Sequence, residues 1–256
     1  MAEQAILIDT SKCIACKGCQ VACKQWNELD AGESEFFAST QGYENPSDLS
    51  YHTYNLIKFY ETEKTNGDPD WLFRKMQCMH CTESACLDNC PKQTIKRMNN
   101  GFVWIDRTEC IGCGTCVAVC PFDIPRLSEE KAEDGYLKSY KCWGCKDRVD
   151  GEINSDVVKD SPVPSCVKTC PTGAAVYGDR DALVDQANAR VSELGGEANV
   201  YGVDELGGLH YIYVLLREPS FYGLPSAAEL SSSSRRAYLR QMKELGKQFL
   251  KKVSSF

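Results

Sequence analysis

The sequence has no apolar run long enough to cross a membrane. A membrane-spanning helix needs about 20 consecutive apolar residues, and the longest apolar run here extends only from Tyr211 to Leu216. The segment from Met1 to Thr10 has neither the basic start nor the apolar core of a secretory signal peptide. We therefore expect no transmembrane segment and no export signal in the chain itself.

Motifs for nucleotide binding and for covalent catalysis are also missing. There is no Walker A loop and no G-x-G-x-x-G fingerprint. The formal net charge of −7 argues against nucleic-acid partners, which require a basic surface. The sequence thus predicts neither a catalytic site nor a nucleic-acid interface.

Cysteine, in contrast, is abundant: sixteen residues fall into four groups of four, with none left over. The first and third groups have the spacing C-x2-C-x2-C-x3-C, the bacterial ferredoxin run for [4Fe–4S] clusters. Proline follows the last cysteine in three of the groups. In chain order, the groups are Cys13, Cys16, Cys19 and Cys23; Cys78, Cys81, Cys86 and Cys90; Cys110, Cys113, Cys116 and Cys120; and Cys142, Cys145, Cys166 and Cys170.

Other uses of cysteine fit this spacing less well. Disulfide frameworks are typical of short secreted chains, and this chain has 256 residues. Structural zinc sites usually have two C-x2–4-C pairs separated by a dozen or more residues, and only the fourth group, C-x2-C-x20-C-x3-C, is comparable. We predict four [4Fe–4S] clusters, with zinc as an alternative at the fourth group.

An internal repeat indicates that one structural unit is used twice. The pattern I-D-x-x-x-C occurs at Ile8–Cys13 and at Ile105–Cys110. A short strand is predicted before each copy, at Ala5–Ile8 and at Gly101–Ile105. Because the second and third groups are close together in the sequence, we expect them to form one module inserted within another that pairs the first and fourth groups.

The predicted fold class is α+β, with two nested ferredoxin-like modules, each holding two [4Fe–4S] clusters, and a C-terminal basic amphipathic helix or tail. Thr53–Glu61 is predicted to be a strand by its β-branched and aromatic residues, and Asp181–Leu194 a helix with Asp179 or Asp181 near its start. The predicted boundaries are 1–30 and 137–216 for the outer module, 68–136 for the inserted module, 31–67 for a surface excursion and strand, and 217–256 for a docking tail.

The C-terminal tail differs in composition from the rest of the chain. After the capping residues Ser231 to Ser234, Tyr238, Met242, Leu245 and Phe249 would share one helix face among many basic residues. We expect this helix to lie along a neighbouring subunit. An anionic membrane surface or a partly disordered tail are the alternatives.

Several residues near the cysteines are candidates for influencing the clusters. His80 could donate a hydrogen bond to cluster sulfur or simply pack within its loop. Trp26 and Trp143 could shield clusters from water or belong to the core. Five lysines near the first and fourth groups could offset cluster charge or be ordinary surface residues: Lys12, Lys17, Lys24, Lys141 and Lys146.

Five stretches of the sequence carry a family resemblance. They are CIACKGCQVACKQWNEL (13–29), WLFRKMQCMHC (71–81), CIGCGTCVAVCPFDIPRL (110–127), KCWGCKDRV (141–149) and PSCVKTCPTGA (164–174), with weaker similarity as far as Pro225. They resemble the iron–sulfur (beta) subunits of the molybdopterin enzymes, which include formate dehydrogenases, nitrate reductases, dimethyl sulfoxide reductases and polysulfide reductases. The similarity is greatest to the formate dehydrogenase beta subunits.

The resemblance implies that each pair of groups shares its ligands. The implied ligand sets are, first, Cys13, Cys16, Cys19 and Cys170; second, Cys23, Cys142, Cys145 and Cys166; third, Cys78, Cys81, Cys86 and Cys120; and fourth, Cys90, Cys110, Cys113 and Cys116. It also implies that the first cluster faces the catalytic subunit and the last faces the electron acceptor.

The chain departs from some of these relatives in two respects. Nitrate-reductase-like relatives have tryptophan in place of one cysteine of the third group, whereas all four cysteines are present here. Membrane-bound formate dehydrogenase beta subunits have a transmembrane helix after the region that ends at Pro225, where this chain has its basic tail. A soluble cytochrome, a ferredoxin or another enzyme module is therefore an alternative to a membrane cytochrome as the acceptor.

The resemblance implies an electron-transfer subunit that has no catalytic site of its own. Its expected partners are a large molybdopterin subunit containing molybdenum or tungsten and a further electron-transfer protein or subunit. The alternatives are the same role for another molybdenum or tungsten oxidoreductase, or a free polyferredoxin carrier. We expect a soluble or peripheral subunit, periplasmic through co-export with the catalytic subunit, with the cytoplasm as the alternative.

Overall fold

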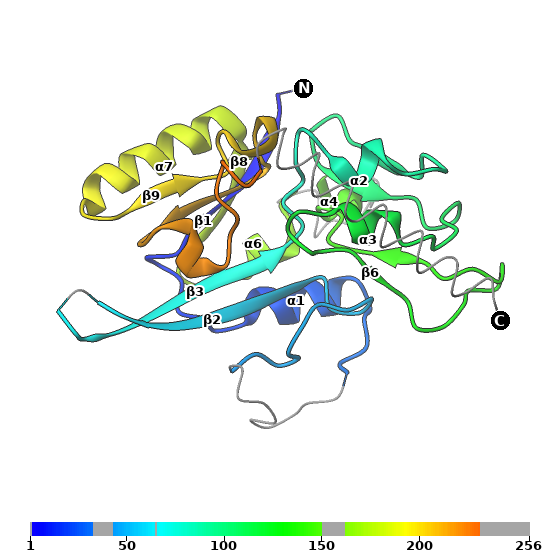
Figure 1. Cartoon of the computed structure of the whole chain (residues 1–256), viewed down its shortest axis with the longest axis horizontal. Helices are drawn as coiled ribbons and strands as arrows, with labels where there is room; N and C mark the ends of the chain where they lie inside the picture. Colours follow the sequence, from blue (N-terminus) through cyan, green and yellow to red (C-terminus); the bar gives the residue numbers. More distant parts are fainter. Residues whose placement is uncertain (1, 33–42, 65, 150–161, 231–256) are drawn as a thin grey trace.

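The computed structural model describes residues 2–32, 43–64, 66–149 and 162–230 (Figure 1). Helices and short strands are mixed along the chain, which confirms the predicted α+β class. No helix in these ranges is both long and apolar enough to span a bilayer. The predicted C-terminal helix and part of the predicted excursion lie outside the described residues.

A four-stranded sheet joins the two ends of the described chain. Its strand order is β8-β1-β10-β9, with β1 parallel to β10 and antiparallel to β8. β1 confirms the strand that was predicted before the first cysteine group. The bounds are Gln4–Asp9 for β1, Ala175–Asp179 for β8, Asn199–Tyr201 for β9 and Tyr211–Leu215 for β10.

The sheet is buried on both faces, so its central strands are almost continuously apolar. Alternate residues of β1 point to opposite faces. Ala5 and Leu7 pack with Leu183 of helix α7 (Arg180–Leu194), which covers one face in Figure 1. Ile6 and Ile8 belong to the larger core on the other face. This second face is turned toward the cysteine loops.

Helix α7 confirms the helix predicted in this part of the chain, but it begins one residue earlier. Asp179 is its N-cap, and its carboxylate accepts a hydrogen bond from the backbone N–H of Ala182 at 3.1 Å. The helix ends before Gly195, which has a positive φ of 62°. Both ends therefore follow ordinary capping chemistry.

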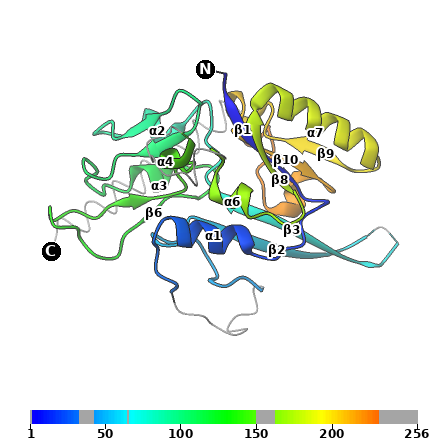
Figure 2. The same ribbon diagram turned by 180° about the vertical axis from the view of Figure 1, so that it is seen from behind.

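A long hairpin, β2 (Asn55–Glu63) with β3 (Pro69–Gln77), crosses the molecule beside α1 (Gly18–Trp26), as Figures 1 and 2 show. The strand predicted at Thr53–Glu61 corresponds to β2, shifted by two residues. Leu49, in the described part of the predicted excursion, is buried in a cluster with residues of both strands. The end of β3 leads directly into the second cysteine group.

Short elements surround the remaining cysteine loops. Helix α1 packs against α6, and α2 packs against α3, so the helices of groups one and four and those of groups two and three lie together. The bounds are Ala85–Asp88 for α2, Thr115–Val119 for α3, Lys146–Val149 for α4, Ser165–Lys168 for α6, Ile95–Arg97 for β4, Val103–Ile105 for β5, Arg126–Leu127 for β6, Ser139–Tyr140 for β7, Glu205–Gly207 for η1 and Pro219–Tyr222 for η2.

Candidate functional site

All four cysteine groups begin with the same backbone turn. The second residue after the first cysteine is left-handed in every group: φ is 53° at Ala15, 48° at His80, 61° at Gly112 and 74° at Gly144. A left-handed residue next to right-handed ones turns neighbouring backbone N–H groups into one concavity, which favours an anionic occupant. The repeated turn is therefore suited to thiolates and an anionic cluster.

Two of these turns leave no room for a side chain. A Cβ atom on Gly112 would lie 2.3 Å from the backbone oxygen of Leu137, and one on Gly144 would lie 2.8 Å from the Phe102 ring. The equivalent position in the first group is Ala15, which already carries a Cβ atom. The third group is thus packed more closely against the chain that leads to the fourth group.

Two cavities are each lined by four cysteines from different sequence groups. One cavity is lined by the fourth set, Cys90, Cys110, Cys113 and Cys116. A second cavity is lined by the third set, Cys78, Cys81, Cys86 and Cys120. The accessible walls of both cavities are mostly apolar, which helps to shield an iron–sulfur cluster.

Cysteines of group one also lie near cysteines of group four. Burial raises the pKa of Cys23, and the neighbouring thiols of Cys142, Cys145 and Cys166 raise it further. Burial also raises the pKa of Cys13, whose neighbouring thiols are Cys170 and Cys16. Cys19 has Cys13 and Cys16 among its neighbours. The fourth cysteine of each group thus lies with thiols of the other group.

The electrostatic interactions between cysteines of different sets follow a linear order. Cys19 of the first set has Cys166 of the second set as a neighbour. Cys142 of the second set has Cys78 of the third set nearby. Cys86 of the third set has Cys116 of the fourth set nearby. The four cysteine sets are therefore arranged as first, second, third and fourth.

The two ends of this order reach the surface. Cys16 of the first set and Cys113 of the fourth set are the exposed cysteines. Three of the four cysteines in the second set are buried, and so is Cys78 of the third set. An electron can therefore enter or leave at either end while the middle remains shielded from solvent.

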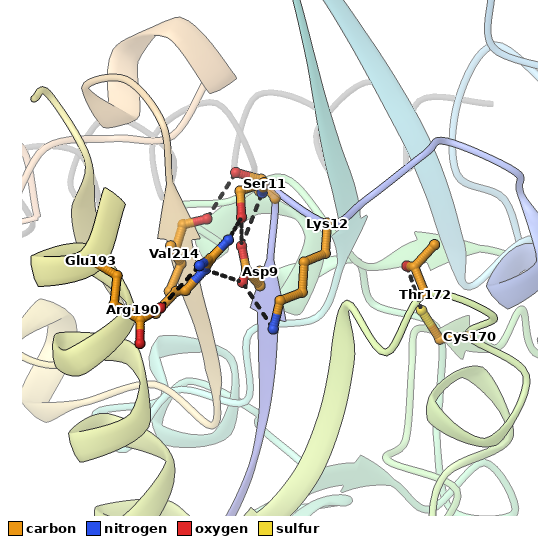
Figure 3. Close-up of polar contacts among 9 residues, drawn as sticks. Asp9, Ser11, Lys12, Cys170, Thr172, Arg190, Glu193 and Val214 are labelled. Atoms are coloured by element: carbon orange, nitrogen blue, oxygen red, sulfur yellow. Dashed lines mark hydrogen bonds and ion pairs between the residues drawn. The ribbon is translucent and has the colours of Figure 1, made fainter. Parts of the chain in front are cut away.

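A polar network anchors the start of the first cysteine loop (Figure 3). The Asp9 carboxylate, buried at the end of β1, accepts hydrogen bonds from the backbone N–H and hydroxyl of Ser11 at 3.0 and 2.5 Å. The Arg190 guanidinium of α7 donates to Asp9 at 3.1 Å and to Ser11 at 3.0 Å. Lys12 lies 3.6 Å from the same carboxylate. The network therefore fixes the residues that directly precede Cys13 against α7.

His80 is completely buried and lines the cavity of the third set. Its Nδ1 accepts the backbone N–H of Val103 at 2.9 Å, whereas its Nε2 has no partner in the described structure. Burial, followed by the charge of Lys141, holds the pKa of His80 well below its usual range. The neutral ring therefore carries its proton on Nε2, as the predicted hydrogen bond to cluster sulfur requires.

The two tryptophans near the cysteines are held by side-chain hydrogen bonds. Trp26 donates to Asp147 at 2.8 Å, and Trp143 donates to Asn27 at 2.7 Å. Both bonds join the region after the first group to the fourth group, so these rings connect the two groups.

The five lysines predicted near the clusters differ in burial. Lys141 is buried, donates to the backbone oxygen of Cys142 at 3.0 Å and lines the cavity of the third set. The other four are partly or fully exposed, and Lys17 and Lys24 donate to backbone carbonyls. A sixth lysine, Lys75, is buried in β3. It was not among the lysines predicted from their positions in the sequence.

All sixteen cysteines are free thiols in the described structure. Burial is the largest cause that raises the pKa of Cys19, Cys120 and Cys145 to about 12. Such thiols release their protons when they bind metal. Among the described residues, no three His, Cys, Asp or Glu side chains converge on the position of one metal ion. The sulfurs instead surround spaces, as a multi-iron cluster requires.

Comparison with known proteins agrees with this chemistry. Two family models, each described as a 4Fe-4S dicluster domain, match residues 12–94 and 69–180. The matches and the sixteen cysteines together confirm four [4Fe–4S] clusters as the cofactors of this chain.

Three curated relatives are similar over most of the chain. The nitrate-inducible formate dehydrogenase iron–sulfur subunit of Escherichia coli is 41% identical, over 91% of this chain and 76% of the relative. The formate dehydrogenase iron–sulfur subunit of Haemophilus influenzae is 40% identical, over 90% and 71%. The formate dehydrogenase 2 subunit beta (cytochrome c-553) of Nitratidesulfovibrio vulgaris is 31% identical, over 86% and 96%. This protein thus belongs to the family of formate dehydrogenase iron–sulfur subunits.

Proposed function

We propose that this chain relays single electrons between the molybdenum- or tungsten-containing catalytic subunit of a formate dehydrogenase and a further electron-transfer protein or subunit. Iron–sulfur clusters held by its thiolates accept and release one electron at a time. The linear order of the four cysteine sets, with Cys16 and Cys113 exposed at opposite ends, carries this proposal.

We further propose the four ligand sets given above and the nested arrangement of the two modules. The cysteine linings of the two cavities support the third and fourth sets. The thiol neighbours of Cys13 and Cys23 support the first and second sets. The packing of α1 on α6 and of α2 on α3 supports the pairing of the groups.

The protein surrounding the sites performs the remaining tasks of a relay. Left-handed turns aim backbone N–H groups at each site, and apolar side chains exclude water from the middle of the path. Because the chain's own groups are rigidly hydrogen-bonded around the cysteines, little reorganisation is needed when charge arrives. In the proposed orientation, the first set faces the catalytic subunit and the fourth set faces the acceptor. We favour the periplasm, reached together with the catalytic subunit, over the cytoplasm.

The proposal is tested by isolating the chain anaerobically together with the large subunit that copurifies with it. That subunit should contain molybdenum or tungsten, and formate should reduce the clusters of this chain in the complex, as followed by electron paramagnetic resonance. The matched control is the isolated chain, which dithionite should reduce and formate should not.

Two results would support the alternative functions instead. A copurifying metal enzyme that reduces the clusters with a different substrate, and not with formate, would assign the chain to another molybdenum or tungsten oxidoreductase. Isolation of the fully loaded chain without any large subunit would indicate a free polyferredoxin carrier.

A further inference from the structure

Lys75 is a buried cation without a carboxylate partner. It lies near the C-terminal end of β3 and is 3% exposed. Its Nζ donates to Oε1 of Gln77 at 3.2 Å and lies 5.0 Å from the centre of the Tyr211 ring. In the parts of the chain that the structure describes, no Asp or Glu forms an ion pair with it. An ammonium group removed from water in this way is unfavourable unless another negative charge compensates it.

The groups that face Lys75 belong to two of the cysteine sets. The Tyr211 ring that the Lys75 ammonium faces has its hydroxyl 3.9 Å from the sulfur of Cys142. Cys166 and Cys19 pack in the same buried cluster as Tyr211, and these three cysteines are the sulfur groups that act electrostatically on Lys75. Cys19 belongs to the first set, whereas Cys142 and Cys166 belong to the second. The ammonium therefore lies at the junction of these two sites.

The surrounding hydrogen bonds fix the backbone and side chain of Lys75. Tyr213 of the central strand β10 donates its hydroxyl hydrogen to the backbone oxygen of Lys75 at 2.6 Å. The same hydroxyl accepts a hydrogen bond from Nε2 of Gln77 at 2.6 Å. Gln77 is thereby oriented with its oxygen toward the Lys75 ammonium. This chain of bonds holds the positive charge in one place rather than leaving it to a mobile side chain.

We propose that Lys75 supplies a fixed positive charge shared by the first and second clusters and raises the reduction potentials of both. The proposal rests on the electron-relay function above and deepens it. Adding an electron makes a cluster more negative, so a nearby buried cation stabilises the reduced state more than the oxidised state. Lys75 thus acts on electron transfer through the clusters, as a positioning residue rather than as a ligand.

Lys141 offers a matched control. This lysine is also buried, but it lies at the cavity of the third set, and it lowers the pKa of Cys86 against the larger effect of burial. At the position equivalent to Lys75, three residues before the first cysteine of the fourth group, the chain has Ser139 instead. Its hydroxyl lies 3.1 Å from the sulfur of Cys116 in the fourth set. The segment before the second cysteine group thus has a buried lysine at this position, whereas the segment before the fourth group has a serine.

The test compares Lys75→Met, Lys75→Gln and Lys141→Met in the intact complex. Iron and acid-labile sulfide are measured first, and the potentials are then measured by redox titration followed by electron paramagnetic resonance. Chemical mediators set the potential in this titration, so the result does not depend on formate or on the substrate of the catalytic subunit. A failure of the formate assignment would thus leave this test interpretable.

We expect both Lys75 variants to retain the iron content of the unaltered complex. The one-electron equilibrium constants for reducing two of the four clusters should fall about tenfold, a shift of about 59 mV to lower potential. Lys141→Met should leave the first cluster unchanged and shift the signal of the third cluster, whose cavity it lines. Unchanged potentials in the Lys75 variants would overturn the proposal. Loss of iron from both variants would also overturn it, because the lysine would then be required to hold the clusters.

Discussion

The proposed exchange of fourth cysteines can be tested by counting iron in single and double cysteine variants. A fully loaded chain should contain about sixteen iron atoms, and loss of one cluster should leave about twelve. Because Cys23 lies among Cys142, Cys145 and Cys166, removing Cys23 and Cys142 together should empty one site only. The Cys23→Ala/Cys142→Ala variant should therefore retain about twelve iron atoms.

The matched pair combines cysteines that are close in sequence but lie in different proposed sets. Cys170 neighbours Cys13 of the first set, so Cys142→Ala/Cys170→Ala should empty two sites and retain about eight iron atoms. If each sequence group instead closed its own cluster, the two double variants would exchange values. Anaerobic iron and sulfide assays distinguish about twelve from about eight readily. The three single variants, each expected near twelve, provide the control.

Three further predictions concern the protein around the clusters. Gly112→Ala should lose about four iron atoms, because its Cβ would lie 2.3 Å from the Leu137 carbonyl oxygen. Ala15→Gly, at the equivalent position of the first group, should retain all of its iron atoms. Equal iron contents in the two variants would contradict this reasoning. Arg74→Met should lower the free energy of unfolding by about 2–4 kcal/mol without changing the iron content. The reason is that the buried guanidinium donates to the backbone oxygens of Tyr222 and Gly223 at 2.7 and 3.0 Å. An unchanged midpoint of thermal unfolding would refute this prediction. Removing iron with a chelator should unfold much of the chain, since metal ligation contributes to folding; circular dichroism that stays unchanged after complete iron loss would show that the sheet folds by itself.

Local features of the structure could be predicted from the sequence, because short-range chemistry determines them. The spacing of the cysteines requires tight turns, and the left-handed residues at Ala15, His80, Gly112 and Gly144 provide them. β1 follows from its apolar β-branched residues, and the start of α7 follows from its capping aspartate.

Long-range features could not be predicted in the same way. The parallel pairing of β1 with β10 joins segments about two hundred residues apart, and no local pattern specifies that register. Lysines close to cysteines in the sequence were the natural candidates for charge compensation, yet four of the five are partly or fully exposed. Lys75 precedes the second cysteine group but lies against cysteines of the first and fourth groups. Its role depends on where β3 crosses the molecule, which is a property of the tertiary fold.

The path of β3 has a consequence for dividing this chain into smaller electron carriers. The duplicated motifs suggest two interchangeable two-cluster units, and the inserted one has predicted boundaries at residues 68 and 136. Cutting there would remove the hydrogen-bond partner of Tyr213 from the central sheet and an ammonium from between the outer cysteine sets. In the excised piece, β3, which carries these groups, would be exposed to solvent. The two predicted modules therefore depend on each other through β3. A two-cluster protein made from the outer module would need a replacement for β3, and one made from the inserted module would need other residues to cover it.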